Sequence, residues 1–119
     1  MLPITKNLST GYNISNRGQY HPEWIVIHYF GSLGTALACS NYFKSGNRNA
    51  SADFFVDDDS IIQFNPDLES NYTWHCGGSL QGNIRHSKYG ICKKCNSIGI
   101  EMRPYNGRGN VLAAQNAGW

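Results

Sequence analysis

The sequence has few charged residues and little excess of either sign. Charged side chains make up 15 % of the 119 residues, against about 25 % in a typical soluble domain. The formal net charge is only +2, and Lys93 and Lys94 are the strongest basic cluster. Nucleic-acid binding normally requires a clustered basic face. The composition therefore predicts no nucleic-acid partner.

Long apolar runs are also missing. No run approaches the roughly 18 residues that cross a bilayer. Residues 1–7 lack the charged-then-apolar layout of a secretory signal peptide. We therefore expect no membrane insertion and no signal peptide, with synthesis in the cytoplasm.

Several catalytic motifs are absent as well. Neither a G-x-x-x-x-G-K-S/T phosphate loop nor a G-x-S-x-G nucleophile elbow occurs, and Gly77-Gly78 starts no such pattern. There are no internal repeats and no linker. A hydrophobic fraction of 40 % and an aromatic fraction of 13 % suffice for one packed core. The chain has 13 glycines in 119 residues, which is more than the average glycine content of about 7 % would give. We therefore expect a single loop-rich domain.

Four cysteines are present, and a chain with its own core does not need them as disulfides. Cys92 and Cys95 form a C-x-x-C pair, and Cys76 lies upstream with His75 and His86 nearby. Four such ligands would close a structural tetrahedral metal site, and packed free thiols are the alternative. The fourth cysteine, Cys39, is expected only to pack.

The first half of the chain predicts an arm, a strand and a helix. Residues 1–20 are polar and are expected to lie as an arm over the domain. Residues 24–30 form an apolar run typical of a central strand buried on both faces. Thr35 is placed to cap a helix over residues 36–44, which ends at Ser45-Gly46.

The second half predicts further strands around a long irregular segment. Residues 51–56 and 60–64 indicate a hairpin with an exposed acidic turn at 57–59. A loop as long as the one from Cys76 to Cys95 is usually functional or tied by a metal. The remaining expected elements are an edge strand at 71–75, a strand at 97–102 and a helix capped by Asn110 that begins at Val111.

Two polar residues interrupt apolar strands. His28 lies between Ile27 and Tyr29, and a buried histidine there is either a hydrogen-bonded core residue or a metal ligand. Glu101 lies between Ile100 and Met102, where a carboxylate either faces water or acts as a general base toward a metal-bound water.

Three segments together resemble a known enzyme family. They are 25–29 (IVIHY), 50–58 (ASADFFVDD) with 61–63 (IIQ), and 73–77 (TWHCG) with 96–102 (NSIGIEM). Their order and separation resemble the zinc-dependent N-acetylmuramoyl-L-alanine amidases, a family that includes phage endolysins, bacterial autolysins and peptidoglycan recognition proteins. The resemblance extends from about residue 20 to the end, and it is strongest to phage and prophage enzymes of Gram-positive bacteria.

The resemblance implies an α/β fold with a mixed central β-sheet flanked by helices, and a groove that holds a zinc ion. His28 matches the first zinc ligand, and Glu101 matches the glutamate that assists the attacking water. The implied reaction cleaves the amide between N-acetylmuramic acid and the L-alanine of the stem peptide. Tyr29, Trp74 and His75 are the expected substrate-binding residues, and bacterial peptidoglycan is the expected partner. The protein would reach the wall after phage lysis or non-classical export.

The sequence also departs from this pattern. Asp53 and Ala52 occupy positions where members often carry a histidine or a catalytic tyrosine, so no role transfers to them. The second histidine ligand, the third ligand and a lysine of the family lie after the helix that begins here at Val111. Residues 1–119 are therefore expected to be an amidase catalytic domain without its C-terminal portion, with an apolar surface that favours self-association.

Two other functions remain open at this stage. One is a module that binds muramyl peptides without cutting them, with Tyr29, Trp74 and Tyr105 as stacking faces. The other is a small interaction domain held together by zinc at Cys76, Cys92 and Cys95. Glu101 distinguishes the enzyme from the binder, because a binder has no use for a buried base.

Overall fold

The computed structural model describes residues 2–29, 34–76 and 90–103. These residues form two sheets, one α-helix and one turn of 3₁₀ helix. The elements in chain order are β1 (Ile4–Lys6), β2 (Ile14–Asn16), β3 (Trp24–Tyr29), α1 (Ala36–Lys44), β4 (Phe54–Val56), β5 (Ile61–Gln63), β6 (Asn71–Thr73), η1 (Lys94–Asn96) and β7 (Ser97–Met102).

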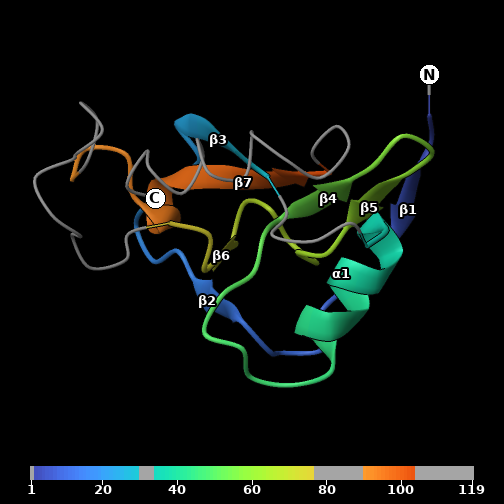
Figure 1. Ribbon diagram of the computed structural model, residues 1–119. Coiled ribbons are helices and arrows are strands. Elements are labelled where there is room, and N and C mark those ends of the chain that lie inside the picture. The colour runs from blue at the N-terminus through green and yellow to red at the C-terminus, as the bar shows by residue number, and fades with distance from the viewer. Residues whose placement is uncertain (1, 30–33, 77–89, 104–119) are drawn as a thin grey trace, which may run out of the picture.

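The larger sheet is mixed, with strand order β1-β5-β4-β7-β3 (Figure 1). β7 pairs in parallel with both β3 and β4, β1 pairs in parallel with β5, and only β4 and β5 are antiparallel. β2 and β6 form a separate antiparallel pair. The mixed sheet with a helix against it confirms the expected α/β fold class.

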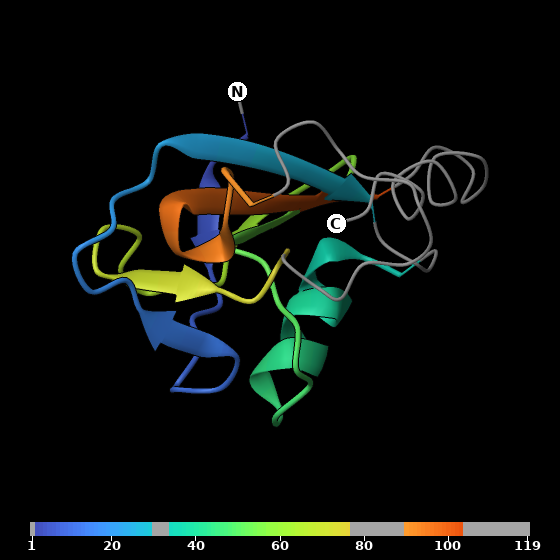
Figure 2. The same cartoon turned by 90° about the vertical axis from the view of Figure 1, so that its left-hand side faces the viewer.

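Helix α1 and the β2–β6 pair lie on the same side of the larger sheet, as both views show (Figures 1 and 2). The residues of α1 that face the sheet are Ala36, Ser40 and Phe43, at helical spacing. The ring of Phe43 stacks on Phe55 of β4 with centroids 5.5 Å apart. The core cluster consists of Ala36, Ala52, Phe55, Ile62 and Phe64, with Ile14, Cys39 and Phe43 packed against it.

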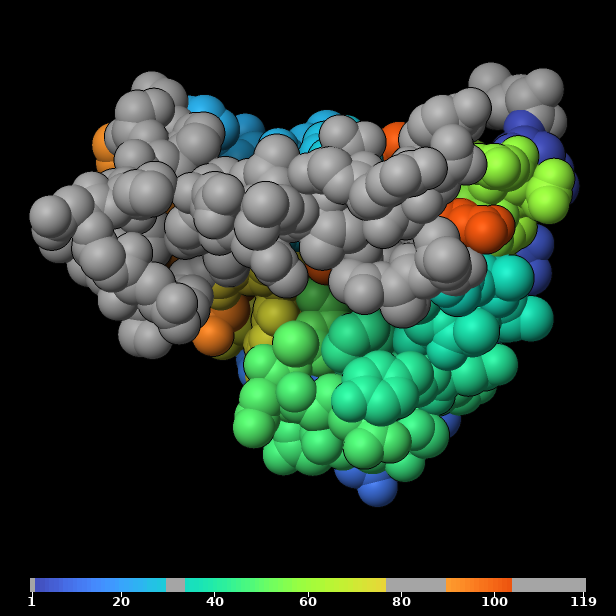
Figure 3. Space-filling model, in the orientation of Figure 1, coloured from blue at the N-terminus to red at the C-terminus, as the bar shows by residue number. Residues whose placement is uncertain are grey.

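The predicted helix boundaries are confirmed. Thr35 accepts a hydrogen bond from the amide of Ala38, and Ser45 is the C-cap. The surface in Figure 3 shows α1 and the segment after it, in cyan to green, as one side of the molecule. Leu37 and Tyr42 are apolar residues on the exposed side of α1, so the helix packs only one of its apolar faces on the sheet.

The β4–β5 hairpin with its acidic turn is confirmed too, and the turn also serves the helix. Oδ2 of Asp57 accepts from the Ala36 amide at 2.8 Å, and Oδ1 accepts from the amides of Asp59 and Ser60. Partial burial alone would raise the pKa of Asp57, but these hydrogen bonds outweigh it and hold the pKa below its usual value. The turn therefore ties the start of α1 to the hairpin.

The prediction that residues 24–30 form the central strand, buried on both faces, is wrong. Among the described strands β3 is at the edge of the sheet, and only Val26 and His28 of β3 are buried. Ile25 is 68 % exposed and Ile27 46 % exposed, on the face away from α1. A run of β-branched residues indicates a strand, but it does not say how many strands flank it. The exposed isoleucines are consistent with the apolar surface expected from sequence, while self-association stays a prediction.

The prediction that residues 1–20 form an arm is also wrong. They contain β1, at one edge of the larger sheet, and β2, which pairs with β6. Asn13 and Arg17 are almost fully buried. The Arg17 guanidinium donates to the carbonyls of Leu68 and Cys95, and burial lowers its pKa. Polar residues usually indicate an exposed segment, but these side chains are buried because they bind backbone carbonyls instead of water.

A buried carboxylate just before β4 binds to β6, to β7 and to the segment after β5. Oδ2 of Asp53 accepts from Thr73 Oγ1 at 2.9 Å and from the Gly99 amide at 2.7 Å, while Oδ1 accepts from Asn65 at 2.6 Å. Burial raises the pKa of Asp53, against the opposing effect of these hydrogen bonds.

We expect Asp53→Asn to destabilise the fold by about 2 to 4 kcal/mol, because the new amide group would face donors at Asn65, Thr73 or Gly99. Urea denaturation of the variant measures this loss. Asp58→Asn, at an exposed turn position, is the matched control and should change stability by less than about 0.5 kcal/mol. Equal effects of the two substitutions would contradict the role given to Asp53.

Some sequence expectations lie outside the described residues. These are the long loop at 77–89 with Gly77, Gly78 and His86, Tyr105, and the helix capped by Asn110 that begins at Val111. The expected strand at 71–75 is present but ends at Thr73, in the small sheet. Within the described residues no helix is long and apolar enough to cross a membrane.

Candidate active site

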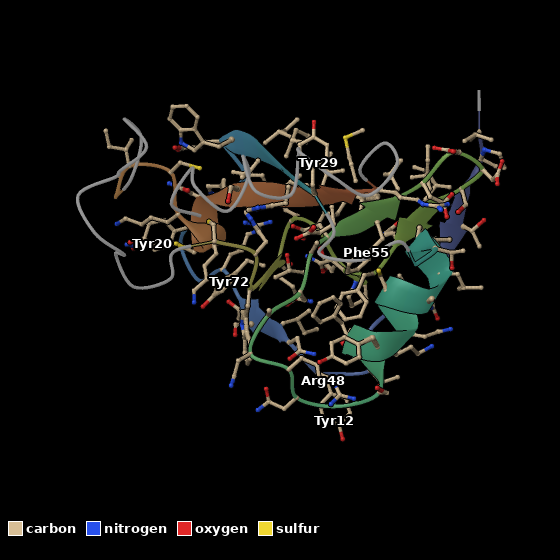
Figure 4. The ribbon with its side chains drawn as sticks, viewed as in Figure 1. Tyr12, Tyr20, Tyr29, Arg48, Phe55 and Tyr72 are labelled. Carbon is tan, nitrogen blue, oxygen red and sulfur yellow. The ribbon has the colours of Figure 1, made fainter. Side chains whose placement is uncertain are left out.

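The two polar residues that interrupt apolar strands lie side by side. His28 on β3 is the register partner of Glu101 on β7, and Glu101 is in turn the partner of Phe55 on β4. Registered residues of adjacent strands share one face of the sheet, with the strands about 4.8 Å apart. Phe55 points toward α1 (Figure 4). His28 and Glu101 therefore lie on the same face of the sheet as α1, on the two strands that follow β4 and its core residue Phe55 in the strand order.

Glu101 is a partly buried carboxyl group whose pKa is strongly perturbed. Burial raises its pKa to about 7, from an ordinary 4.5. A carboxylate with a pKa near neutrality can take up and release a proton under physiological conditions. This is the property that a general base needs.

His28 and His75 form a buried pair. His75 lies two residues after β6, and its Nδ1 is 3.2 Å from Nε2 of His28. The two rings meet edge to face, with centroids 5.4 Å apart. Burial lowers the pKa of His28 to about 4 and that of His75 to about 3, the charge of His28 contributing in the second case. Both rings are therefore neutral at pH 7, and neutral imidazole is the form that binds metals.

The position of His75 depends on two residues of β7. Nε2 of His75 lies 2.9 Å from the hydroxyl of Ser97, which is fully buried and also donates to the carbonyl of Lys93 at 2.5 Å. Gly99 lies directly under the His75 ring, where a Cβ would come within 2.3 Å of Cγ. Only glycine permits this approach of ring and strand.

The aromatic residues expected to bind substrate lie apart from this group. Tyr29 ends β3 on the face opposite His28, by strand alternation, and Figure 4 shows it directed away from the helix side. Trp74 is half-buried, and its Nε1 donates to Ser15 at 2.9 Å. Substrate binding by Tyr29, Trp74 and His75 stays a prediction.

None of the four cysteines, all within the described residues, forms a disulfide. Cys76 and Cys92 are buried, Cys95 is half-buried, and Cys39 packs against the core as expected. Burial, with a smaller contribution from the neighbouring Cys92, raises the pKa of Cys76 to about 11. Cys76 is therefore protonated at pH 7. A structural metal at Cys76, Cys92 and Cys95 stays a prediction.

Comparison with known proteins identifies the family. The family model described as N-acetylmuramoyl-L-alanine amidase matches residues 18–116. The chain belongs to this amidase family. A search of curated proteins gave no match.

Solved structures agree with this assignment. A mutant endolysin from Bacillus subtilis is 28 % identical, with a TM-score of 0.61, and the match covers 96 % of this amidase and 68 % of that chain. The catalytic domain of XlyA is 27 % identical, with a TM-score of 0.60, over 95 % of this chain and 68 % of the other. The Staphylococcus aureus hydrolase AmiA is 20 % identical, with a TM-score of 0.63, over 98 % and 50 % respectively, and supports the fold alone.

The described residues of this amidase fit one zinc ligand and not a complete set. The His28 ring is neutral at pH 7, which is the form that binds metals. It also lies beside Glu101, the candidate general base. A catalytic zinc site uses three protein ligands and one open position. Within residues 2–29, 34–76 and 90–103, no three histidine, cysteine, aspartate or glutamate side chains are arranged so that they could hold a metal ion.

Sequence reasoning proposed His28 and Glu101 as site residues but missed the residues around them. Ser97 was only the first residue of an expected strand, and Gly99 was not singled out. A glycine within a strand often marks the close approach of another group. Gly99 within its strand, together with the T-W-H segment at residues 73–75, was the sequence feature that could have indicated the packing of His75 on β7.

Proposed function

We propose that this amidase hydrolyses the amide bond between N-acetylmuramic acid and the L-alanine of the peptidoglycan stem peptide. The observation that carries the proposal is the register pairing of His28 with Glu101, whose pKa burial raises to about 7. The family match supplies the substrate class, and the catalytic domain of XlyA is a structural relative.

We further propose that His28 is one ligand of a catalytic Zn²⁺ and that the other ligands lie outside the described residues. A bound zinc ion would polarise the scissile carbonyl and acidify a water molecule. Glu101, as the carboxylate, accepts the proton of the attacking water. The resulting carboxylic acid then returns that proton to the nitrogen of the departing alanine, which leaves Glu101 ready for another cycle.

Residues 1–119 would then belong to an amidase catalytic domain that is made in the cytoplasm and acts on the cell wall after release. Tyr29 and Trp74 would offer faces to the sugar or peptide. Tyr29 lies on the face opposite His28 and Trp74 is half-buried, so the support for these two contacts is the family resemblance. Recognition of muramyl peptide without cleavage is the competing function, and the incomplete ligand set in the described residues favours testing it directly.

The test is digestion of purified Gram-positive peptidoglycan with added zinc, followed by mass spectrometry for new amino-terminal L-alanine. In a protein that carries the complete set of zinc ligands, we expect release by the unmodified form and a loss of at least about 100-fold in Glu101→Gln, the usual range for removal of a general base. Glu69→Gln is the matched control, since Glu69 is exposed and pairs only with His21 among the described residues.

Each outcome assigns a function. Release that Glu101→Gln abolishes and Glu69→Gln preserves supports the amidase proposal. Binding of peptidoglycan with no release in any variant indicates a recognition module. Release that Glu101→Gln leaves unchanged contradicts the role of Glu101 as the base.

A further inference from the structure

A continuous line of polar contacts runs from a backbone carbonyl to His28. The carbonyl oxygen of Lys93 is 2.5 Å from Ser97 Oγ, which is 2.9 Å from His75 Nε2. Nδ1 of His75 is then 3.2 Å from His28 Nε2. Ser97, His75 and His28 are each no more than 8 % exposed, so water does not compete freely for these contacts.

The chemistry of the groups fixes the direction of every hydrogen bond in this line. The thiols of Cys76 and Cys92 also interact with the Ser97 hydroxyl. The carbonyl oxygen of Lys93 can only accept, is a stronger acceptor than a thiol and lies 2.5 Å away, so the single hydroxyl proton of Ser97 is donated to Lys93. Ser97 Oγ must then accept from His75, which places the proton of His75 on Nε2. A neutral imidazole with a proton on Nε2 carries its lone pair on Nδ1. Nδ1 of His75 therefore accepts, and Nε2 of His28 donates.

We propose that Ser97 and His75 are positioning residues that hold His28 with its proton on Nε2 and its lone pair on Nδ1. Nδ1 of His28 is thereby the atom left to bind an electrophile. The ring position is held as well, because Gly99 lets the His75 side chain approach β7 to a distance that no larger residue allows. Partners that fix the tautomer and orientation of a ligating histidine are a general requirement of metal sites.

This inference deepens the proposed function and rests on it only for the use of His28 as a ligand. The tautomers and the hydrogen bond are properties of the folded chain itself. Its failure and the failure of the amidase proposal are therefore distinguishable, because the test below contains neither metal nor substrate.

The experiment is ¹⁵N nuclear magnetic resonance of the labelled chain at pH 7. Long-range spectra show which nitrogen of each imidazole carries the proton, and an N–N scalar coupling across the hydrogen bond identifies donor and acceptor. We expect protons on Nε2 of both His28 and His75. A coupling should connect His28 Nε2 to His75 Nδ1, with the bonded proton on His28.

Ser97→Ala removes the hydroxyl that makes His28 the donor in its hydrogen bond with His75. We therefore expect loss or reversal of this coupling, and faster solvent exchange of the His28 ring proton. His75→Phe keeps a ring but no nitrogen, so the coupling must vanish. Ser40→Ala is the matched control, because Ser40 is another fully buried serine and bonds only to Leu37 and Asn7 among the described residues.

Two results would overturn the inference. One is an unmodified chain with the bonded proton on His75 Nδ1. The other is a Ser97→Ala variant that is folded, as its amide spectrum shows, and retains the coupling in the original direction. If Ser97→Ala does not fold, the directions in the unmodified chain and the loss of coupling in His75→Phe still decide the question.

Discussion

Replacing Glu101 with glutamine should stabilise the fold at pH 8 while removing the amidase activity. The pKa of Glu101 is about 7 in the folded chain and about 4.5 when unfolded. Between these values the folded state binds more protons, so its stability falls as pH rises from about 4.5 to 7 and then levels off. Glutamine carries no charge at any pH, so the variant should gain about 2 to 3 kcal/mol at pH 8 and nothing at pH 4.

Urea denaturation of the metal-free chain at pH 4 and pH 8 measures this difference. Glu69→Gln is again the control, and its effect should be small at both values because Glu69 is exposed. A Glu101→Gln variant that is no more stable than the unmodified chain at pH 8 would show that Glu101 is not held in a costly environment. It would also weaken the case for Glu101 as a base, since the same burial provides its raised pKa.

Replacing Gly99 with alanine should be among the most damaging small substitutions in the chain. The new Cβ would lie 2.3 Å from Cγ, 2.6 Å from Cδ2 and 2.7 Å from Cβ of His75. These atoms belong to a buried ring and its base, not to the far end of a flexible side chain. Overpacking of this kind costs about 1 to 3 kcal/mol, and displacement of His75 would also break its contact with His28.

The matched control is Gly46→Ala, where a Cβ meets nothing within 4 Å. We expect a large drop in the urea midpoint for Gly99→Ala and a change below about 1 kcal/mol for Gly46→Ala. The imidazole signals of His28 and His75 should shift in the first variant alone. A Gly99→Ala protein with unchanged stability and unchanged histidine signals would disprove the packing of His75 on β7.

The local elements of this fold were predictable because their signals are local. Thr35, the apolar spacing after it and Ser45-Gly46 define α1, and the acidic turn defines the β4–β5 hairpin. The order of strands was not predictable, because β3 finds its partner β7 across most of the chain. β1 and β2 were missed because they lie in a polar segment with no apolar alternation around them, whereas β4 and β5 lie in longer apolar stretches joined by an acidic turn.

In the candidate site too, local sequence signals could be recognised and contacts between distant segments could not. His28 and Glu101 could be proposed from sequence because each is a polar residue in an apolar strand, a contrast that is visible in one short segment. The partnership of His75 with Ser97 was not found, because nothing in either segment requires the other. Only the register of β7 against β3, and the return of the chain after β6, bring them together.

The parallel pairing of β3 with β7 has a consequence for how the protein is made. Parallel pairs between distant segments form slowly, because a long loop must close before they contribute stability. During translation β3 emerges long before β7, so its isoleucines have no partner strand until most of the chain has left the ribosome. His28 and Glu101 meet only in that last step. The nascent chain therefore has no assembled His28–Glu101 pair, and chaperones that bind exposed apolar strands would have their longest access to β3.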